Sequence, residues 1–256
     1  MEEVILMDEN SSESVKNEFD NKIGRLTKSK AYLDFCEEVY GYRMYLFNMM
    51  DRQQLDFVFN SIPLSSDDTL LDLGCGSGSI LNLLAEKYGC SGIGIDQLNS
   101  DVIGKSSKSV TYINGDIDKL PDYKLKPTVT LSIDSLYFSS DMDKLLRYLS
   151  GLPNNKMYLF YSQYLFEETG DRGTLLGPYT KLADVLNQSG FSYETVDYSE
   201  NERLLYERAL AALEKRKEEF ISEGNLDLYE GKLKEDAFGK HLYDNGLASR
   251  FLYIVK

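Results

Sequence analysis

Three glycines at alternate positions, Gly74, Gly76 and Gly78, follow the acidic residue Asp72. The residues before them form a short apolar run, and residues 79–88 have the spacing of an amphipathic helix. A strand, a glycine turn and a helix in this order are typical of a site for a nucleotide-type cofactor. Glycine suits such a turn because a backbone without Cβ atoms approaches a ligand closely and adopts positive φ at little cost. This stretch therefore predicts a cofactor-binding loop.

The spacing of the glycines narrows the choice of cofactor. A dinucleotide fingerprint, G-x-G-x-x-G, requires a glycine at the position of Ser79. A phosphate-binding P-loop requires a lysine shortly after the glycines, and none occurs before Lys87. The carboxylate of Asp72 would repel a phosphate but can accept a hydrogen bond from an ammonium group. The loop therefore favours a ligand with a cationic group; the alternative role for Asp72 is to cap the loop.

The elements that must position this loop alternate between strand and helix patterns. Strands are expected at residues 70–73, 91–95, 110–113, 128–133, 157–161 and 191–198. Helices are expected between them, at 79–88, 141–149 and 178–188. This alternation predicts an α/β fold with a mostly parallel sheet and helices on both faces.

Two helical regions flank this core. The first is rich in aromatic residues, which favours core packing over ligand contact, and Gly41 is expected to divide it into separate helices. The second begins at Ser199, which together with Glu202 has the spacing of a capping box. The expected units are an N-terminal helical cap segment (1–62), a core (63–198 and 249–256) and a helical insertion that forms a lid (199–248).

Composition excludes several classes of function. The 256 residues carry a net charge of −14, which would repel the phosphate backbone of a nucleic acid over most of the surface. The three cysteines, Cys36, Cys75 and Cys90, lack the spacing of metal ligands and are interpreted as reduced thiols of a cytoplasmic protein. We expect neither a signal peptide nor a membrane span, because the first residues lack a basic region and no long apolar run follows.

The segment Leu71–Gly78 resembles the first motif of class I S-adenosylmethionine-dependent methyltransferases. Further landmarks of that family occur in order at the ends of expected strands: Gly92–Asp96, Asn114–Ile117 and Ile133–Tyr137. The resemblance implies a Rossmann-like, seven-stranded, mostly parallel sheet with an antiparallel last strand. The sequence pattern adds N-terminal helices and a helical insertion between strands 6 and 7 to this core, because the strand–helix alternation stops at residue 198.

The resemblance also implies contacts to S-adenosylmethionine at the carboxyl ends of the strands. Asp96 would accept hydrogen bonds from both ribose hydroxyls, because a carboxylate offers two oxygens to two neighbouring donors. Asp116 would accept a hydrogen bond from the adenine amino group, with an ordinary turn as the alternative. The implied cofactor-binding residues are Asp72, Gly74, Cys75, Gly76, Gly78, Asp96, Gln97, Asp116, Ile117 and Asp134.

The expected reaction is an in-line displacement, since the sulfonium methyl group is already activated. The protein then has mainly to position the acceptor and exclude water. Asp134 and Tyr137, after the fourth strand, are the candidate catalytic residues by position alone. His241, the only histidine, is a candidate base, although a structural or solvent-facing role is the more common one.

The aromatic N-terminal segment and the insertion are expected to form a lid over the methyl donor, with Tyr40, Tyr42, Tyr45 and His241 facing the substrate pocket. A tyrosine-rich pocket suits a small organic acceptor and would also accommodate a cationic amine against the ring faces. The alternatives are a protein or nucleic-acid methyltransferase and a non-catalytic S-adenosylmethionine-binding protein. A nucleic-acid acceptor is disfavoured by the charge and by Asp134–Tyr137, which departs from the Asn/Asp-Pro-Pro-Tyr/Phe motif. Neither the acceptor nor the oligomeric state follows from the sequence.

Overall fold

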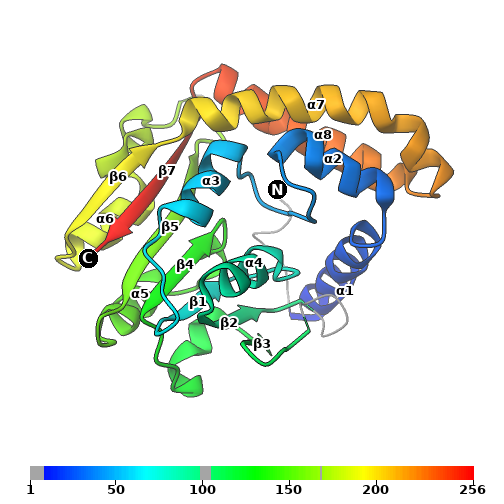
Figure 1. Ribbon diagram of the computed structural model, residues 1–256. Helices are drawn as coiled ribbons and strands as arrows, with labels where there is room; N and C mark the ends of the chain where they lie inside the picture. The colour runs from blue at the N-terminus through cyan, green and yellow to red at the C-terminus, as the bar shows by residue number, and fades with distance from the viewer. Residues whose placement is uncertain (1–8, 99–104, 168) are drawn as a thin grey trace.

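A seven-stranded sheet forms the centre of the computed structural model, which describes residues 9–98, 105–167 and 169–256 (Figure 1). The strand order is β3-β2-β1-β4-β5-β7-β6, and only β7 runs antiparallel to its neighbours. The strands are β1 (Thr69–Leu73), β2 (Ser91–Asp96), β3 (Val110–Asn114), β4 (Val129–Ile133), β5 (Lys156–Tyr164), β6 (Tyr193–Asp197) and β7 (Ala248–Val255). The predicted α/β fold with an antiparallel last strand is confirmed.

The register of the parallel strands brings the predicted site residues to one edge of the sheet. In β1, Asp72 lies opposite Gly94 of β2 and Leu131 of β4. All residues of β4 are buried, including the hydroxyl residues Thr130 and Ser132, as expected for a central parallel strand. Because parallel strands end at the same edge, the glycine loop, Asp96 and Asp134 leave the sheet side by side.

Helices cover both faces of the sheet, because side chains alternate along each strand. On one face, Leu70, Leu131 and Phe160 belong to the core that includes α3 and α4. On the other face, Leu71 and Leu159 pack with α5 and α6. These helices are α3 (Arg52–Asn60), α4 (Ser79–Tyr88), α5 (Met142–Ser150) and α6 (Lys181–Gln188).

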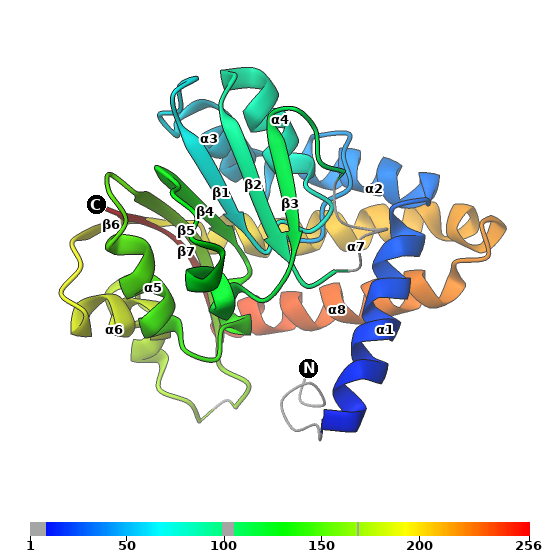
Figure 2. The same cartoon turned by 90° about the horizontal axis from the view of Figure 1, so that it is seen from below.

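Four more helices form a cap on one side of the molecule (Figure 2). They are α1 (Glu9–Leu26), α2 (Lys30–Tyr40), α7 (Ser199–Ser222) and α8 (Leu226–Asp244). The expected division at Gly41 is present, since Gly41 ends α2 with a φ of 79°. α7 packs against both α2 and α8, and Arg25 of α1 pairs with Asp227 of α8 at 2.6 Å. The N-terminal segment and the insertion therefore form one helical layer, which we call the helical cap.

Two predictions for helix starts are wrong. Ser199 and Glu202 do not form a capping box: the N-cap of α7 is Tyr198, which provides no side-chain cap. Ser199 Oγ accepts a hydrogen bond from Arg250 N instead, and the Glu202 side chain points into the interior. The helix expected at 178–188 begins as α6 at Lys181, because Thr180 is its N-cap and accepts from Ala183 N.

Candidate functional site

The glycine loop between β1 and α4 is held by backbone hydrogen bonds to the neighbouring strand. Gly74 N and Cys75 N both donate to Ile95 O of β2, at 2.8 and 3.2 Å. Gly74, Gly76 and Gly78 have φ values of 67°, 54° and 76°, a region that other residues rarely adopt. The predicted glycine turn is therefore present, and its conformation requires these glycines.

Two of the three glycines also allow close packing. A Cβ atom on Gly74 would lie 2.4 Å from Ser135 Cβ in the loop after β4. A Cβ atom on Gly78 would lie 2.1 Å from the hydroxyl of Tyr112. Gly76 is different, because the nearest atom to its Cβ position is a ring carbon of Phe47 at 3.7 Å. The open side of the loop therefore faces the segment between α2 and α3.

Asp96 at the end of β2 organises this loop. Its carboxylate accepts hydrogen bonds from Gly76 N at 2.8 Å and from Leu98 N at 2.9 Å. Burial raises the pKa of Asp96, while these backbone donors oppose the rise. Each carboxylate oxygen has a second lone pair, so both remain able to accept from a pair of ligand hydroxyls.

Asp72 is the most unusual carboxylate of the site. Only 4% of its surface is exposed, and within residues 9–98, 105–167 and 169–256 no hydrogen bond reaches its carboxylate. Burial, followed by the negative charge of Asp96, raises the pKa of Asp72 to about 8. A buried carboxylate without a partner is costly to ionise, so a cationic group placed beside it would be strongly stabilised.

The remaining residues predicted to bind the cofactor lie in a turn after β3, in the loop after β2 and in the glycine loop. Asp116 accepts a hydrogen bond from Asp118 N at 2.9 Å and so caps a 3₁₀ turn. Ile117 is buried within the same turn, and Gln97 is exposed after Asp96. Burial raises the pKa of the Cys75 thiol well above its ordinary value, which keeps it protonated.

Asp134 follows β4 and carries a strong ion pair. Arg250 of β7 donates from Nη1 to Oδ1 at 2.7 Å and from Nη2 to Oδ2 at 3.0 Å. Oδ2 also accepts a hydrogen bond from Met49 N at 3.1 Å. Tyr137 lies in the next turn, where its ring packs against Tyr161 and 40% of its surface is exposed.

Solved structures with a similar fold include an N-methyltransferase and a cyclopropane synthase. Phosphoethanolamine N-methyltransferase 2 of Haemonchus contortus, solved with S-adenosylhomocysteine, matches 93% of this chain and 60% of its own with a TM-score of 0.69 and 18% identity. The chain thus spans about three fifths of that protein. The cyclopropane synthase MmaA2 of Mycobacterium tuberculosis matches with the same TM-score at 13% identity, covering 93% of this chain and 98% of its own. This chain has the class I S-adenosylmethionine-dependent methyltransferase fold.

Two further comparisons agree with this methyltransferase fold. A methyltransferase of Geobacter sulfurreducens, solved with S-adenosylhomocysteine, matches with a TM-score of 0.58 and 16% identity, over 87% of this chain and 97% of its own. The family described as methionine biosynthesis protein MetW matches residues 52–129, which contain the glycine loop, Asp96 and Asp116. No curated protein matches the chain in sequence.

The segment that follows α2 lies against the glycine loop of the methyltransferase fold. Ser77 Oγ is 3.5 Å from Tyr45 O, and Phe47 approaches Gly76. The Phe47 ring stacks on Tyr32 of α2 at a centroid distance of 5.8 Å. Phe47 was not among the predicted site residues, because nothing in its local sequence distinguishes it from the other aromatic residues of the segment.

The three tyrosines predicted for the lid have different positions. Tyr45 lies in the segment beside the loop and is partly buried. Tyr40 is 1% exposed and packs edge-on against Phe35 in the core of the helical cap. Tyr42 donates a short hydrogen bond to Asp56 of α3, away from the glycine loop. His241 is exposed on α8, with Nδ1 3.2 Å from Asn245 Nδ2.

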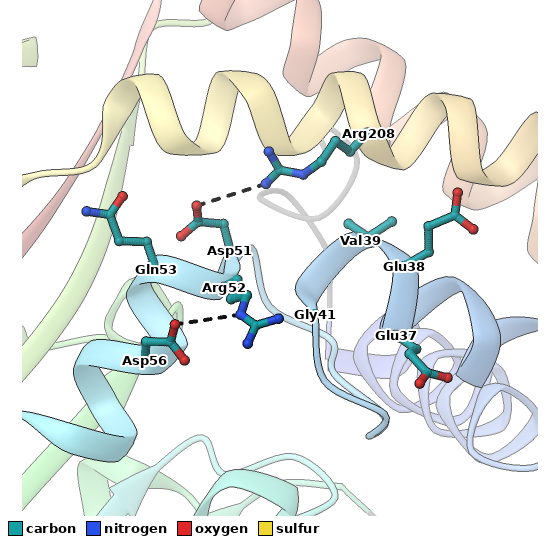
Figure 3. A pocket seen from close by; sticks show the side chains of 9 residues that line it. All are labelled: Glu37, Glu38, Val39, Gly41, Asp51, Arg52, Gln53, Asp56 and Arg208. Carbon is teal, nitrogen blue, oxygen red and sulfur yellow. Dashed lines mark ion pairs between the residues drawn. The ribbon is translucent and has the colours of Figure 1, made fainter.

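A separate hollow of about 630 Å³ lies on the outside between α2, α3 and α7 (Figure 3). Its walls carry both signs of charge, with Arg208 3.9 Å from Asp51 and Arg52 3.7 Å from Asp56. None of the predicted site residues lines it. In the described part of the chain, no helix is long and apolar enough to cross a membrane, and no group of three histidine, cysteine or acidic side chains is arranged to hold a metal ion.

Proposed function

We propose that this protein transfers the methyl group of S-adenosylmethionine to a small-molecule acceptor. The observation that carries the proposal is the pair of acidic side chains beside the glycine loop. Asp72 has no partner among the described residues and a raised pKa, which suits the ammonium group of the methionine moiety. Asp96 retains accepting capacity on both oxygens, which suits the two ribose hydroxyls.

The remaining contacts to the cofactor follow from the same edge of the sheet. We assign the backbone of Gly74, Gly76 and Gly78, with Cys75, to the wall along the methionine moiety, because Gly76 leaves the side of this loop that faces the segment between α2 and α3 open. Gln97, Asp116 and Ile117 are assigned to the adenine. The loop at Asp134 closes the far end of the site, next to the acceptor.

The chemistry needs little from the protein beyond geometry. S-adenosylmethionine, held by Asp72, Asp96 and the glycine loop, would supply a methyl group activated by its positively charged sulfur, with S-adenosylhomocysteine as the leaving group. The segment between α2 and α3 excludes water from the site, because Phe47 and Met49 lie over the glycine loop and Asp134. Tyr137, exposed in the turn after Asp134, is the candidate contact to the acceptor.

The short distance between the segment after α2 and the ends of the strands favours a small acceptor. Tyr45, Phe47 and Met49 all lie within contact distance of the loops that would hold the methyl donor. A nucleic acid would also have to approach a protein with a net charge of −14. The structural neighbour from Haemonchus contortus is named as a methyltransferase of phosphoethanolamine, a small molecule, which supports a small acceptor for this protein.

Calorimetry with S-adenosylmethionine, S-adenosylhomocysteine and NAD tests the cofactor assignment. We expect binding of the first two and none of NAD. Asp96→Ala should lose most of the affinity, and Asp122→Ala, an exposed carboxylate in the turn after Asp116, should retain it. Intact affinity in Asp96→Ala would disprove the ribose assignment.

Transfer of a labelled methyl group into a metabolite extract tests catalysis and separates the alternatives. A labelled small molecule supports the proposal, and label in protein or nucleic acid identifies a different acceptor. Binding of S-adenosylmethionine without transfer into any of these would point to a non-catalytic binding protein.

A further inference from the structure

Arg250 lies at the centre of a polar network that is buried beneath the helical cap. It lies near the start of β7, where it is the only charged residue of the strand, and its side chain is 0% exposed. The guanidinium contacts two carboxylates: it binds Asp134 with two hydrogen bonds, and Nη1 lies 3.4 Å from Glu202 of α7. Its other donors reach Gln54 Oε1 of α3 at 2.6 Å and Met50 Sδ at 3.3 Å. One residue therefore connects the site loop, the cap and the segment after α2.

Hydroxyl groups stabilise the second carboxylate of this network by donating hydrogen bonds to it. Two carboxylates face one guanidinium, and Glu202 is fully buried, so it needs hydrogen-bond donors besides Arg250. Burial raises the pKa of Glu202, and the charge of Arg250 opposes that rise. The donors to Glu202 are Tyr243 at 2.7 Å, Ser162 at 2.8 Å, Tyr164 at 3.2 Å and Tyr206 at 3.3 Å. Arg250 is thus left to pair mainly with Asp134.

The accepting positions of Asp134 are largely occupied. Arg250 takes one position on each oxygen in the bidentate geometry that fits a carboxylate. Met49 N takes a further position on Oδ2. Asp134 also has a φ of 54°, unusual for a residue other than glycine, and the loop holds it there to aim the carboxylate at Arg250. A carboxylate whose oxygens are bound in this way is a poor general base, because an ion pair opposes its protonation, but it can hold the backbone at Met49 in place.

We propose that Arg250 is a positioning residue: it holds the carboxylate of Asp134 so that Asp134 pins the backbone of residues 42–50 over the methyl-donor site. The inference rests on the proposed function in one respect: it takes the ligand bound beneath residues 42–50 to be S-adenosylmethionine. Without the guanidinium, the Asp134 carboxylate, whose side chain is 12% exposed, would lose both hydrogen bonds of its ion pair and would turn toward water. In that position it would release Met49 N, and Phe47 and Tyr45 would lift from the glycine loop.

Hydrogen exchange of the free protein, followed by mass spectrometry, tests the pinning directly. In Arg250→Met, we expect amides within residues 42–50 to exchange roughly ten- to a hundredfold faster, the range for loss of one charged hydrogen bond. Amides in β1 and β4 should change little. Arg250→Lys should give an intermediate rate, because an ammonium group cannot form the bidentate pair. Arg216→Met is the matched control: Arg216 is also buried in the cap, but it pairs with Glu38 away from the site.

Asp134→Asn gives an independent variant in case Arg250→Met does not fold. It keeps the shape of the side chain and removes the charge, and it should speed exchange in residues 42–50 as Arg250→Met does. The double variant should be no faster than the singles, because both changes remove the same interaction. Additive effects, or equal acceleration throughout the protein in both variants, would overturn the proposal.

The dissociation rate of S-adenosylhomocysteine, measured by stopped flow, links the pinning to the site. We expect Arg250→Met and Asp134→Asn to release it roughly tenfold faster or more, and Arg216→Met to release it at the wild-type rate. If the wild type does not bind S-adenosylhomocysteine, the proposed function fails while the exchange experiment still decides the role of Arg250. If the wild type binds and exchange in residues 42–50 is the same in all variants, the role of Arg250 is refuted and the proposed function stands.

Discussion

The raised pKa of Asp72 predicts that cofactor affinity depends on pH in a specific way. In the free protein, burial and the charge of Asp96 raise the pKa of Asp72 to about 8, so most molecules carry a protonated carboxyl at pH 7. Cys75 and Tyr112 are the other titratable groups that sense this charge, and the pKa of each is raised as well. Binding an ammonium group beside Asp72 requires the ionised form. Binding must therefore release a proton.

The size of the effect follows from the ionised fraction of Asp72. With a pKa of about 8, roughly one molecule in a hundred is ionised at pH 6 and one in two at pH 8, so ionisation of Asp72 alone would raise affinity about fiftyfold. The ligand's α-amino group, with an ordinary pKa of about 8, is itself about half deprotonated at pH 8, so the measured affinity should rise about twenty-fivefold, or roughly 1.9 kcal/mol, and the rise should stop there.

Calorimetric titration with S-adenosylhomocysteine at pH 6, 7 and 8 measures both the affinity and the proton release. Titrations in two buffers with different ionisation enthalpies give the number of protons, which should approach one at pH 6. Asp72→Asn should bind more weakly at pH 8 and show little pH dependence. An affinity that is constant between pH 6 and 8 in the wild type would refute the ammonium role of Asp72.

Asp72→Asn, which should weaken cofactor binding, should stabilise the free protein against unfolding at pH 8. The folded state holds the Asp72 proton more tightly than the unfolded state, whose pKa is near 3.8. The free energy of unfolding therefore falls as pH rises from about 4 to about 8. Asp72→Asn removes this loss, so its Tm at pH 8 should exceed that of the wild type. A lower Tm for the variant at pH 8 would mean that Asp72 is stabilised by a partner in the free protein.

Further predictions concern the loop and the cap. Gly74→Ala should destabilise the protein by about 2 kcal/mol or more in urea unfolding and abolish S-adenosylhomocysteine binding, because the new Cβ meets Ser135 and φ is positive. Gly190→Ala, where φ is positive but no atom lies within 4 Å, should cost only about 1 kcal/mol and leave binding intact. Equal effects in the two variants would contradict the close-packing argument. Lys232→Met should cost roughly 3–5 kcal/mol, since it leaves the carboxylate of Asp236, 0% exposed, without its cation 2.8 Å away. Lys232→Met combined with Asp236→Leu should recover much of that stability, and no recovery would show that the pair itself is not the cause.

The sequence by itself was sufficient for the core of the fold and for the loop. Alternation of β and α patterns predicted the parallel sheet, because parallel strands are joined by helices that cover both faces of the sheet. The glycine spacing predicted the turn, since glycine adopts positive φ values at little cost and tolerates the approach of Ser135. The sequence also predicted that Asp72 and Asp96 lie beside the loop, because Asp72 lies in the strand before it and Asp96 ends the next strand along the chain. These features depend on residues that are neighbours in the chain.

Only the tertiary structure decided what lies across from the loop. The pattern of Ser199 and Glu202 predicts a capping box, yet α7 docks against the sheet and buries Glu202 near Arg250, 48 residues away in the chain. Arg250 and Asp134 are separated by 116 residues, and no local pattern pairs them. Likewise, Phe47 and Met49 contact the site while Tyr40 packs in the cap, although all belong to one aromatic segment. The reason is physical: a side chain's local sequence sets which secondary structure it joins, whereas its partner is set by which elements meet when the helical cap closes on the sheet.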